Sequence, residues 1–201
     1  IWGFLNEFDS CSQEGRNLCK ELVDLIHSED NSRPATFASR FSTSDECFDL
    51  VDLIACNTYP GWATENACEP EETIRPCLDK IIQYCRSKVP AEKPILISEI
   101  GICAIYGAHD PAATQWSEEF QVDYLSRVIR EVFASGEICG LSLWQLNNAH
   151  TYHRQGGCLR VKPLGENSAG VYDLYRRPKL AAQAVSEHFR ALPETCPDKG
   201  K

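Results

Sequence analysis

Short apolar runs that alternate with helical periods constrain the fold of this chain most strongly. We predict strands over residues 1–7, 35–39, 53–58, 95–99 and 140–146, and helices over residues 15–28, 71–89, 117–136 and 178–191. The strand runs are apolar throughout, which is typical of strands that are covered on both faces. The pattern therefore predicts an α/β fold with a parallel sheet, in which most strands are followed by helices in strict alternation.

Two helices illustrate the pattern. Leu18, Leu22, Leu25 and Ile26 fall on one face of the first predicted helix, which we expect to be its buried face. In the third helix, Ser117 is suited to the N-cap position. Acidic residues then occupy the first turn, where they favour the helix dipole, at Glu118 and Glu119.

Five strand–helix units fit either an open doubly wound sheet or part of an eight-stranded barrel. A dinucleotide-binding sheet needs a glycine-rich phosphate loop after its first strand. The chain instead has Asn6, Glu7, Phe8 and Asp9 there. The sequence therefore disfavours nucleotide binding.

Composition excludes several classes of partner. The net charge is −9, and no basic run is available to neutralise phosphates, so we expect no nucleic-acid partner. The longest apolar runs fall far below the ~20 residues that span a bilayer, so we expect no membrane span. The 11 cysteines include no pair at zinc-ligand spacing, so we expect no metal and no cofactor. Without a visible leader, reduced thiols in a cytoplasmic protein are the favoured interpretation.

Polar residues stand where the predicted strands end, which is where barrel enzymes hold their active sites. Two of these residues are the carboxylates Glu7 and Glu99. A lone buried carboxylate is costly, but a facing pair is what glycoside hydrolysis requires. The other strand-end residues are Asn6, Asn57, Tyr59, Ser98, Trp144 and Gln145.

Seven segments in order now resemble one family. They read IWGFLNE, RPATF, DLIACNTYPGW, KPILISEIG, WSEEFQ, LWQLNN and GVYDLYRRPKLAA. They are similar to the family-2 glycoside hydrolases, most of all to the β-glucuronidase and β-galactosidase branches. The resemblance implies a partial (β/α)8 TIM barrel, strands 4–8 with their helices, over residues 1–192, with a C-terminal tail at residues 193–201. The chain lacks Met and begins at Ile1 inside a predicted strand, so we expect a fragment without the first three barrel strands.

The resemblance implies a retaining β-glycosidase that hydrolyses terminal β-linked sugars through a covalent glycosyl-enzyme. Glu7 would be the acid/base and Glu99 the nucleophile. Asn6 would bind the sugar 2-hydroxyl, and Trp144 would form an aromatic floor under the sugar ring.

Further binding residues also follow from the resemblance. Asn57 and Tyr59 would line the sugar subsite, although a turn-stabilising role before Pro60 and Gly61 is equally compatible with the sequence.

In glucuronidases, an Asn-x-Lys pair binds the sugar carboxylate. This chain has Asn167 but Ala169 in place of the Lys, so Arg160 or Lys162 is the candidate substitute.

The competing hypothesis is a catalytically silent half-barrel, or a sugar-binding or assembly module. A homo-oligomer of the full-length protein is compatible with either hypothesis. Two further groups have ordinary interpretations. His150 and His153 are expected to be solvated loop residues, and residues 176–179 are expected to be the solvated start of the last helix.

Overall fold

The computed structural model describes residues 1–62, 70–151 and 162–193. The chain forms two compact units. The first comprises Ile1–Ile102 and Arg130–Gln145, and the second comprises Cys103–Ile129 and Leu146–Lys201.

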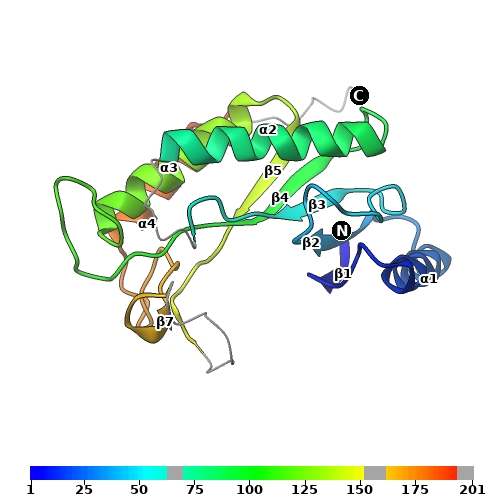
Figure 1. The fold of residues 1–201 in the computed structure, drawn as a ribbon. Helices are drawn as coiled ribbons and strands as arrows, with labels where there is room; N and C mark the ends of the chain where they lie inside the picture. Colours follow the sequence, from blue (N-terminus) through cyan, green and yellow to red (C-terminus); the bar gives the residue numbers. More distant parts are fainter. Residues whose placement is uncertain (63–69, 152–161, 194–201) are drawn as a thin grey trace, which may run out of the picture. The chain divides into compact units, whose positions relative to one another are not determined.

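The first unit contains a five-stranded sheet with the order β1-β2-β3-β4-β5 (Figure 1). Every neighbouring pair is parallel. Each strand therefore lies beside the next strand in the chain, as in a barrel, whereas a doubly wound sheet reverses its order at a switch point. The predicted parallel α/β sheet is confirmed. The strands are β1 (Trp2–Asn6), β2 (Ala35–Ser39), β3 (Ile54–Asn57), β4 (Ile95–Ile100) and β5 (Ile138–Leu143).

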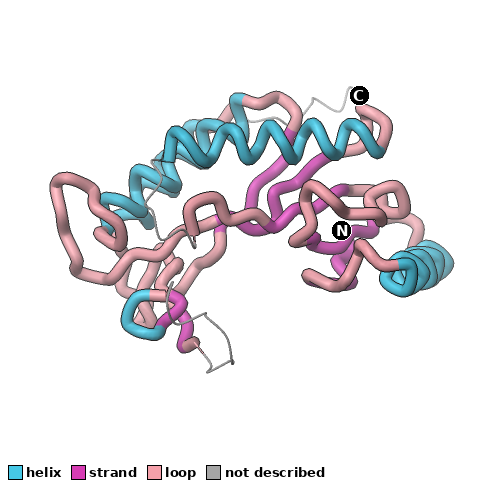
Figure 2. Tube along the Cα trace, viewed as in Figure 1, coloured by secondary structure: helices cyan, strands magenta, loops and turns pink. Residues whose placement is uncertain are grey.

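Two details of the predicted strands are wrong. The last strand ends at Leu143, so Trp144 follows the strand instead of lying within it. Strict alternation also fails, because residues 40–53 connect β2 and β3 through turns and bends without a helix (Figure 2). Serine and aspartate side chains in this connection bond to nearby backbone groups, as when Asp45 Oδ1 accepts from the Cys47 amide at 2.7 Å. Such local bonds compete with helix formation.

Helix α1 (Gln13–Glu29) begins where the Ser12 side chain accepts from the Gly15 amide. Its buried face is not the predicted one. Leu18 and Leu25 are 44% and 56% exposed. The buried residues are Gly15, Cys19 and Val23. A Cβ on Gly15 would lie 1.8 Å from the Asp9 carbonyl oxygen, so the glycine allows close backbone approach on this face.

Helix α2 (Pro70–Lys88) belongs to the first unit, and α3 (Glu118–Ala134) begins in the second unit and ends in the first. In α2, Ile74, Leu78, Ile81 and Cys85 recur at helical spacing, and all four are fully or nearly fully buried. Every cysteine in the described ranges is a free thiol. No helix in these ranges is long and apolar enough to cross a membrane.

The second unit contains α4 (Leu180–Ala191), the 3-10 helix η1 (Pro163–Gly165) and a small antiparallel pair, β6 (Ala149–His150) with β7 (Glu166–Asn167). Ser117 accepts from the Phe120 amide at 3.1 Å, which confirms the predicted N-cap of α3. His150 is exposed, and His153 lies outside the described residues.

Two charged residues of the second unit have roles that the sequence did not predict. Lys179 was expected to be solvated, but it is 2% exposed. Its ammonium donates to the carbonyl oxygens of Ala104 and Ser168, each at 2.7 Å. Glu118 is in the first turn of α3 as expected, and its carboxylate also accepts from the Leu180 amide at the start of α4. Both side chains satisfy backbone groups that burial would otherwise leave unpaired.

Candidate active site

The end of β1 places Glu7 in an unusual backbone conformation. Glu7 has a φ of 52°, in the left-handed region that residues with a Cβ rarely adopt. Its amide donates to the carbonyl oxygen of Ala38 at 2.8 Å, which fixes it against β2. Residues held in such conformations cluster at functional sites, where the surrounding structure compensates for the strain. The backbone therefore supports a functional role for the Glu7 side chain.

Asn57, the last residue of β3, connects the two candidate carboxylates. It is 4% exposed. Its Nδ2 donates to Glu7 Oε1 at 3.0 Å and lies 3.2 Å from Asn6 Oδ1. Asn57 also acts on Glu99, because its side-chain amide lowers the pKa of that carboxyl group. The side-chain amide of Asn57 thus faces Glu7 and Asn6, whereas a residue that only stabilised the following turn would bond to the backbone of that turn.

Glu99 lies near the end of β4, with its Cα paired to that of Asn57. Burial raises the pKa of its carboxyl group, and the charge of Glu7 raises this pKa further. Hydrogen bonds from Tyr59 and Asn57 act in the opposite direction. The hydroxyl of Tyr59 donates to Glu99 Oε2. The electrostatic influence of Glu7 means that both carboxyl groups belong to one site.

Trp144 follows β5 beside the end of β4. Its amide donates to the carbonyl oxygen of Ile100 at 2.8 Å, and the peptide bond to Gln145 is cis. The side chain is half-buried. Trp62 packs edge-to-face on Tyr59 with ring centroids 5.1 Å apart. These two tryptophans add aromatic surface at the sheet end that carries the carboxylates.

Two polar residues near the strand ends make hydrogen bonds that the sequence did not predict. Ser98 donates from its hydroxyl to Asn57 Oδ1 at 2.7 Å. Its position at a strand end was the only available signal in the sequence. Asp45 is buried and accepts from the hydroxyls of Ser10 and Ser39, which follow β1 and end β2. No sequence pattern distinguished Asp45 from the other polar residues of its turn.

The remaining predicted binding residues belong to other parts of the chain. Asn167 is a buried residue of β7 in the second unit, where its Oδ1 lies 3.5 Å from the Ala169 amide. Arg160 lies outside the described residues. The first unit alone therefore brings together Asn6, Glu7, Asn57, Tyr59 and Glu99.

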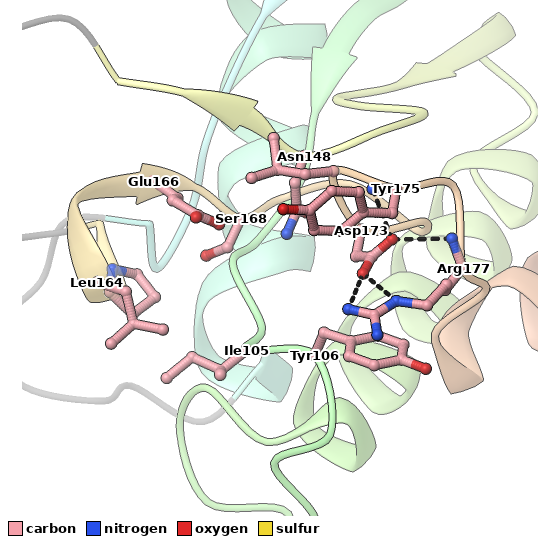
Figure 3. Close-up of a pocket in the computed structure, with 11 residues that line it drawn as sticks. Ile105, Tyr106, Asn148, Leu164, Glu166, Ser168, Asp173, Tyr175 and Arg177 are labelled. Atoms are coloured by element: carbon pink, nitrogen blue, oxygen red, sulfur yellow. Dashed lines mark hydrogen bonds and ion pairs between the residues drawn. The ribbon is translucent and has the colours of Figure 1, made fainter.

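The second unit has a pocket of its own, with a volume of about 170 Å³ (Figure 3). Arg177 lines it but is already paired, because its guanidinium bonds to the buried carboxylate of Asp173 at 2.5–2.6 Å. The same guanidinium lies 4.2 Å from the ring centre of Tyr106. Asp173 also accepts from the amides of Tyr175 and Arg177. These contacts stabilise the loop before α4.

No group of three or more His, Cys, Asp or Glu side chains within the described ranges is arranged to hold a metal ion. The chemistry available at the sheet end is that of two carboxylates with amide, hydroxyl and aromatic neighbours.

Comparison with known proteins gives one consistent family. The family described as "Glycosyl hydrolases family 2, TIM barrel domain" matches residues 1–190. The β-glucuronidase of Streptococcus agalactiae is 25% identical over 199 residues, which is 96% of this chain and 31% of that protein. The β-glucuronidase of Sus scrofa is 28% identical over 195 residues, with coverage of 96% and 28%.

Solved structures agree with this assignment. A GH2 β-galacturonidase from Eisenbergiella tayi, bound to galacturonate, has a TM-score of 0.83 and 35% identity, covering 96% of this chain and 33% of that chain. A β-glucuronidase from Ruminococcus gnavus has a TM-score of 0.79 and 26% identity, covering 94% and 32%. The chain spans about a third of the length of the relatives that it matches.

Proposed function

Because this chain belongs to the family-2 glycosyl hydrolases through their TIM barrel domain, we propose that it acts in the hydrolysis of terminal β-glycosides with retention of configuration. One observation carries the proposal. A single buried residue, Asn57, donates to Glu7 Oε1 at 3.0 Å and pairs with Glu99 in the neighbouring strand, at the carboxyl ends of parallel strands. Two adjacent carboxyl groups in such a position are the required apparatus of a retaining glycosidase.

The proposed reaction has two steps. In the first, Glu7 donates its proton to the glycosidic oxygen while a Glu99 carboxylate oxygen bonds to the anomeric carbon, and the aglycone leaves as an alcohol. In the second, Glu7 takes a proton from water, the water oxygen bonds to the anomeric carbon, and Glu99 leaves as a carboxylate. Asn6 would bind the sugar 2-hydroxyl, and Trp144 would face the ring.

Hydrogen-bond donors beside Glu99 counter part of the effect of its burial, and the pKa of Glu99 stays above its ordinary value. A nucleophilic carboxylate must be ionised before substrate binds, whereas burial and the charge of Glu7 both raise its pKa. The Tyr59 hydroxyl and the Asn57 amide stabilise the ionised form by hydrogen bonding. The donors are therefore part of the proposed catalytic arrangement.

For the substrate class, we propose β-hexuronides, with galacturonides preferred to glucuronides. The support is the 35% identity with the E. tayi β-galacturonidase, against 25–28% for the two curated β-glucuronidases. Ala169 also stands where the glucuronidase motif has a Lys.

The test is hydrolysis of a panel of aryl β-glycosides, comprising the galacturonide, glucuronide and galactoside. Glu99→Gln should abolish turnover. Glu7→Gln should lower it by roughly 10²–10⁴-fold, and less for a leaving group that needs no proton. Glu92→Gln makes the same change at an exposed turn residue of the same unit and should behave as wild type.

Product stereochemistry completes the test. Proton NMR of the first-formed sugar should show the β-anomer, and an α-anomer would refute retention. Unchanged turnover in Glu99→Gln would refute the assigned nucleophile. Sugar binding without turnover by the wild-type protein on the entire panel would favour the silent-module hypothesis instead.

A further inference from the structure

We propose that Ser98 is a positioning residue that holds the Asn57 side-chain amide in one orientation, with its NH₂ group toward Glu7 and Glu99. This inference deepens the proposed function and rests on it. It gives a role to the Ser98 hydroxyl, which bonds to Asn57 Oδ1.

The chemistry of the contacts fixes the orientation of the amide. The ionised Glu99 can only accept hydrogen bonds, so the side of Asn57 that faces the two carboxyl groups, 3.0 Å from Glu7 Oε1, is the NH₂ group. The carbonyl oxygen of Asn57 then faces the other way, 2.7 Å from Ser98 Oγ. An amide oxygen also only accepts, so the Ser98 hydroxyl must donate its single proton to it.

An irregularity in the sheet explains how Ser98 reaches Asn57. In a regular strand, successive side chains point to opposite faces, so Ser98 and Glu99 would not both reach the same neighbour. The register of β3 and β4 pairs Cys56 with Ile97 but Asn57 with Glu99, which leaves Ser98 as an extra residue. Such bulges are over-represented beside active sites, where they redirect side chains.

The orientation matters because Asn57 is only 4% exposed. If the amide rotated by half a turn, its oxygen would face the oxygens of the carboxyl groups, with little water to separate them. Ionisation of Glu99 would then become less favourable. The bond from Ser98 opposes this rotation, and thereby supports the ionised form of Glu99.

Within the described ranges, two further groups act on the pKa of Glu99. Tyr59 donates to it from the segment after β3, and the charge of Glu7 acts on it from the end of β1. On the β5 side, residues 141–145 carry no titratable side chain. A change at Ser98 should therefore appear directly in the titration of Glu99.

The experiment is an NMR titration of the side-chain carboxyl carbons in ¹³C,¹⁵N-labelled protein. Ser98→Ala should raise the pKa of Glu99 by about one pH unit, which is the scale of one hydrogen bond to a charged group. Ser98→Thr keeps the hydroxyl and should restore the wild-type value. An unshifted titration in Ser98→Ala, or an equal shift in Ser98→Thr, would overturn the inference.

Wild-type protein provides a second measurement that does not depend on how well the variants fold. The side-chain ¹⁵NH₂ signals of Asn57 should shift with pH in step with the carboxyl carbon of Glu99. Asn57 ¹⁵NH₂ signals that do not change while Glu99 titrates would also overturn the inference. Failure of the proposed function would give another result. The Glu99 and Asn57 titrations would agree with the inference, but the wild-type protein would hydrolyse no glycoside of the panel.

Discussion

Replacing Gly101 by alanine tests how closely the ends of β4 and β5 must approach. Gly101 is buried and follows Glu99 by two residues. An added Cβ would lie 1.8 Å from the carbonyl oxygen of Trp144, where real Cβ atoms essentially never come within 3.0 Å. The two backbone segments would therefore have to separate by about 1.2 Å. The bond from the Trp144 amide to Ile100, at 2.8 Å, resists this separation.

Two effects should follow from Gly101→Ala. Overpacking against rigid backbone should lower the free energy of unfolding by about 3 kcal/mol. Displacing catalytic groups by about 1 Å should lower kcat/KM by on the order of 10²-fold. Denaturant unfolding and hydrolysis of the preferred aryl glycoside measure the two effects separately.

Gly3→Ala is the matched control for this substitution. Gly3 lies in β1 of the same sheet, and a Cβ there would meet nothing within 4 Å. Alanine at such a site should leave stability unchanged or raise it slightly, by restricting the unfolded chain. If Gly101→Ala protein were as stable as Gly3→Ala protein and had wild-type kcat/KM, the inferred close approach of Gly101 to Trp144 would be refuted.

Three further predictions concern single side chains. Tyr59→Phe removes a donor to Glu99, so the pKa of Glu99 should rise and the acidic limb of the pH–rate profile should move to higher pH. Asp45→Ala leaves two buried hydroxyls and an amide without their acceptor, so denaturant unfolding should show a loss of about 3 kcal/mol. Burial lowers the pKa of Lys179 from 10.5 to about 8, so the unfolded chain binds more protons between these values and stability should rise with pH there. Lys179→Met should remove that rise, and its persistence in unfolding measured from pH 8 to 10.5 would contradict the assignment.

The main polar residues of the site could be predicted from the sequence, because the ends of the strands can be recognised where the apolar runs stop. Apolar runs end at Glu7, Asn57 and Glu99, and parallel strands bring such ends to one edge of a sheet. Tyr59 lies two residues beyond a strand end and was found for the same reason. The buried residues of α2 likewise recur at helical spacing in the sequence.

The buried face of α1 depended instead on how closely the neighbouring backbone approaches the helix. Leucines at helical spacing indicated one face, but the helix buries the face with Gly15, Cys19 and Val23. Because Gly15 has no side chain, the backbone at Asp9 can approach the helix closely. The spacing of apolar residues carries no information about this close approach.

By itself, the sequence determined the kinds of element, the parallel order expected of them and the two carboxylates, because these depend on local apolar patterns and on where the patterns stop. The tertiary structure alone decided that β4 bulges at Ser98, that Asn57 donates to Glu7 while pairing with Glu99 across the sheet, and that Lys179 is buried on two carbonyl oxygens. Strand register and the pairing of buried polar groups depend on residues far apart in the chain. One local sequence pattern is compatible with several registers and several pairings.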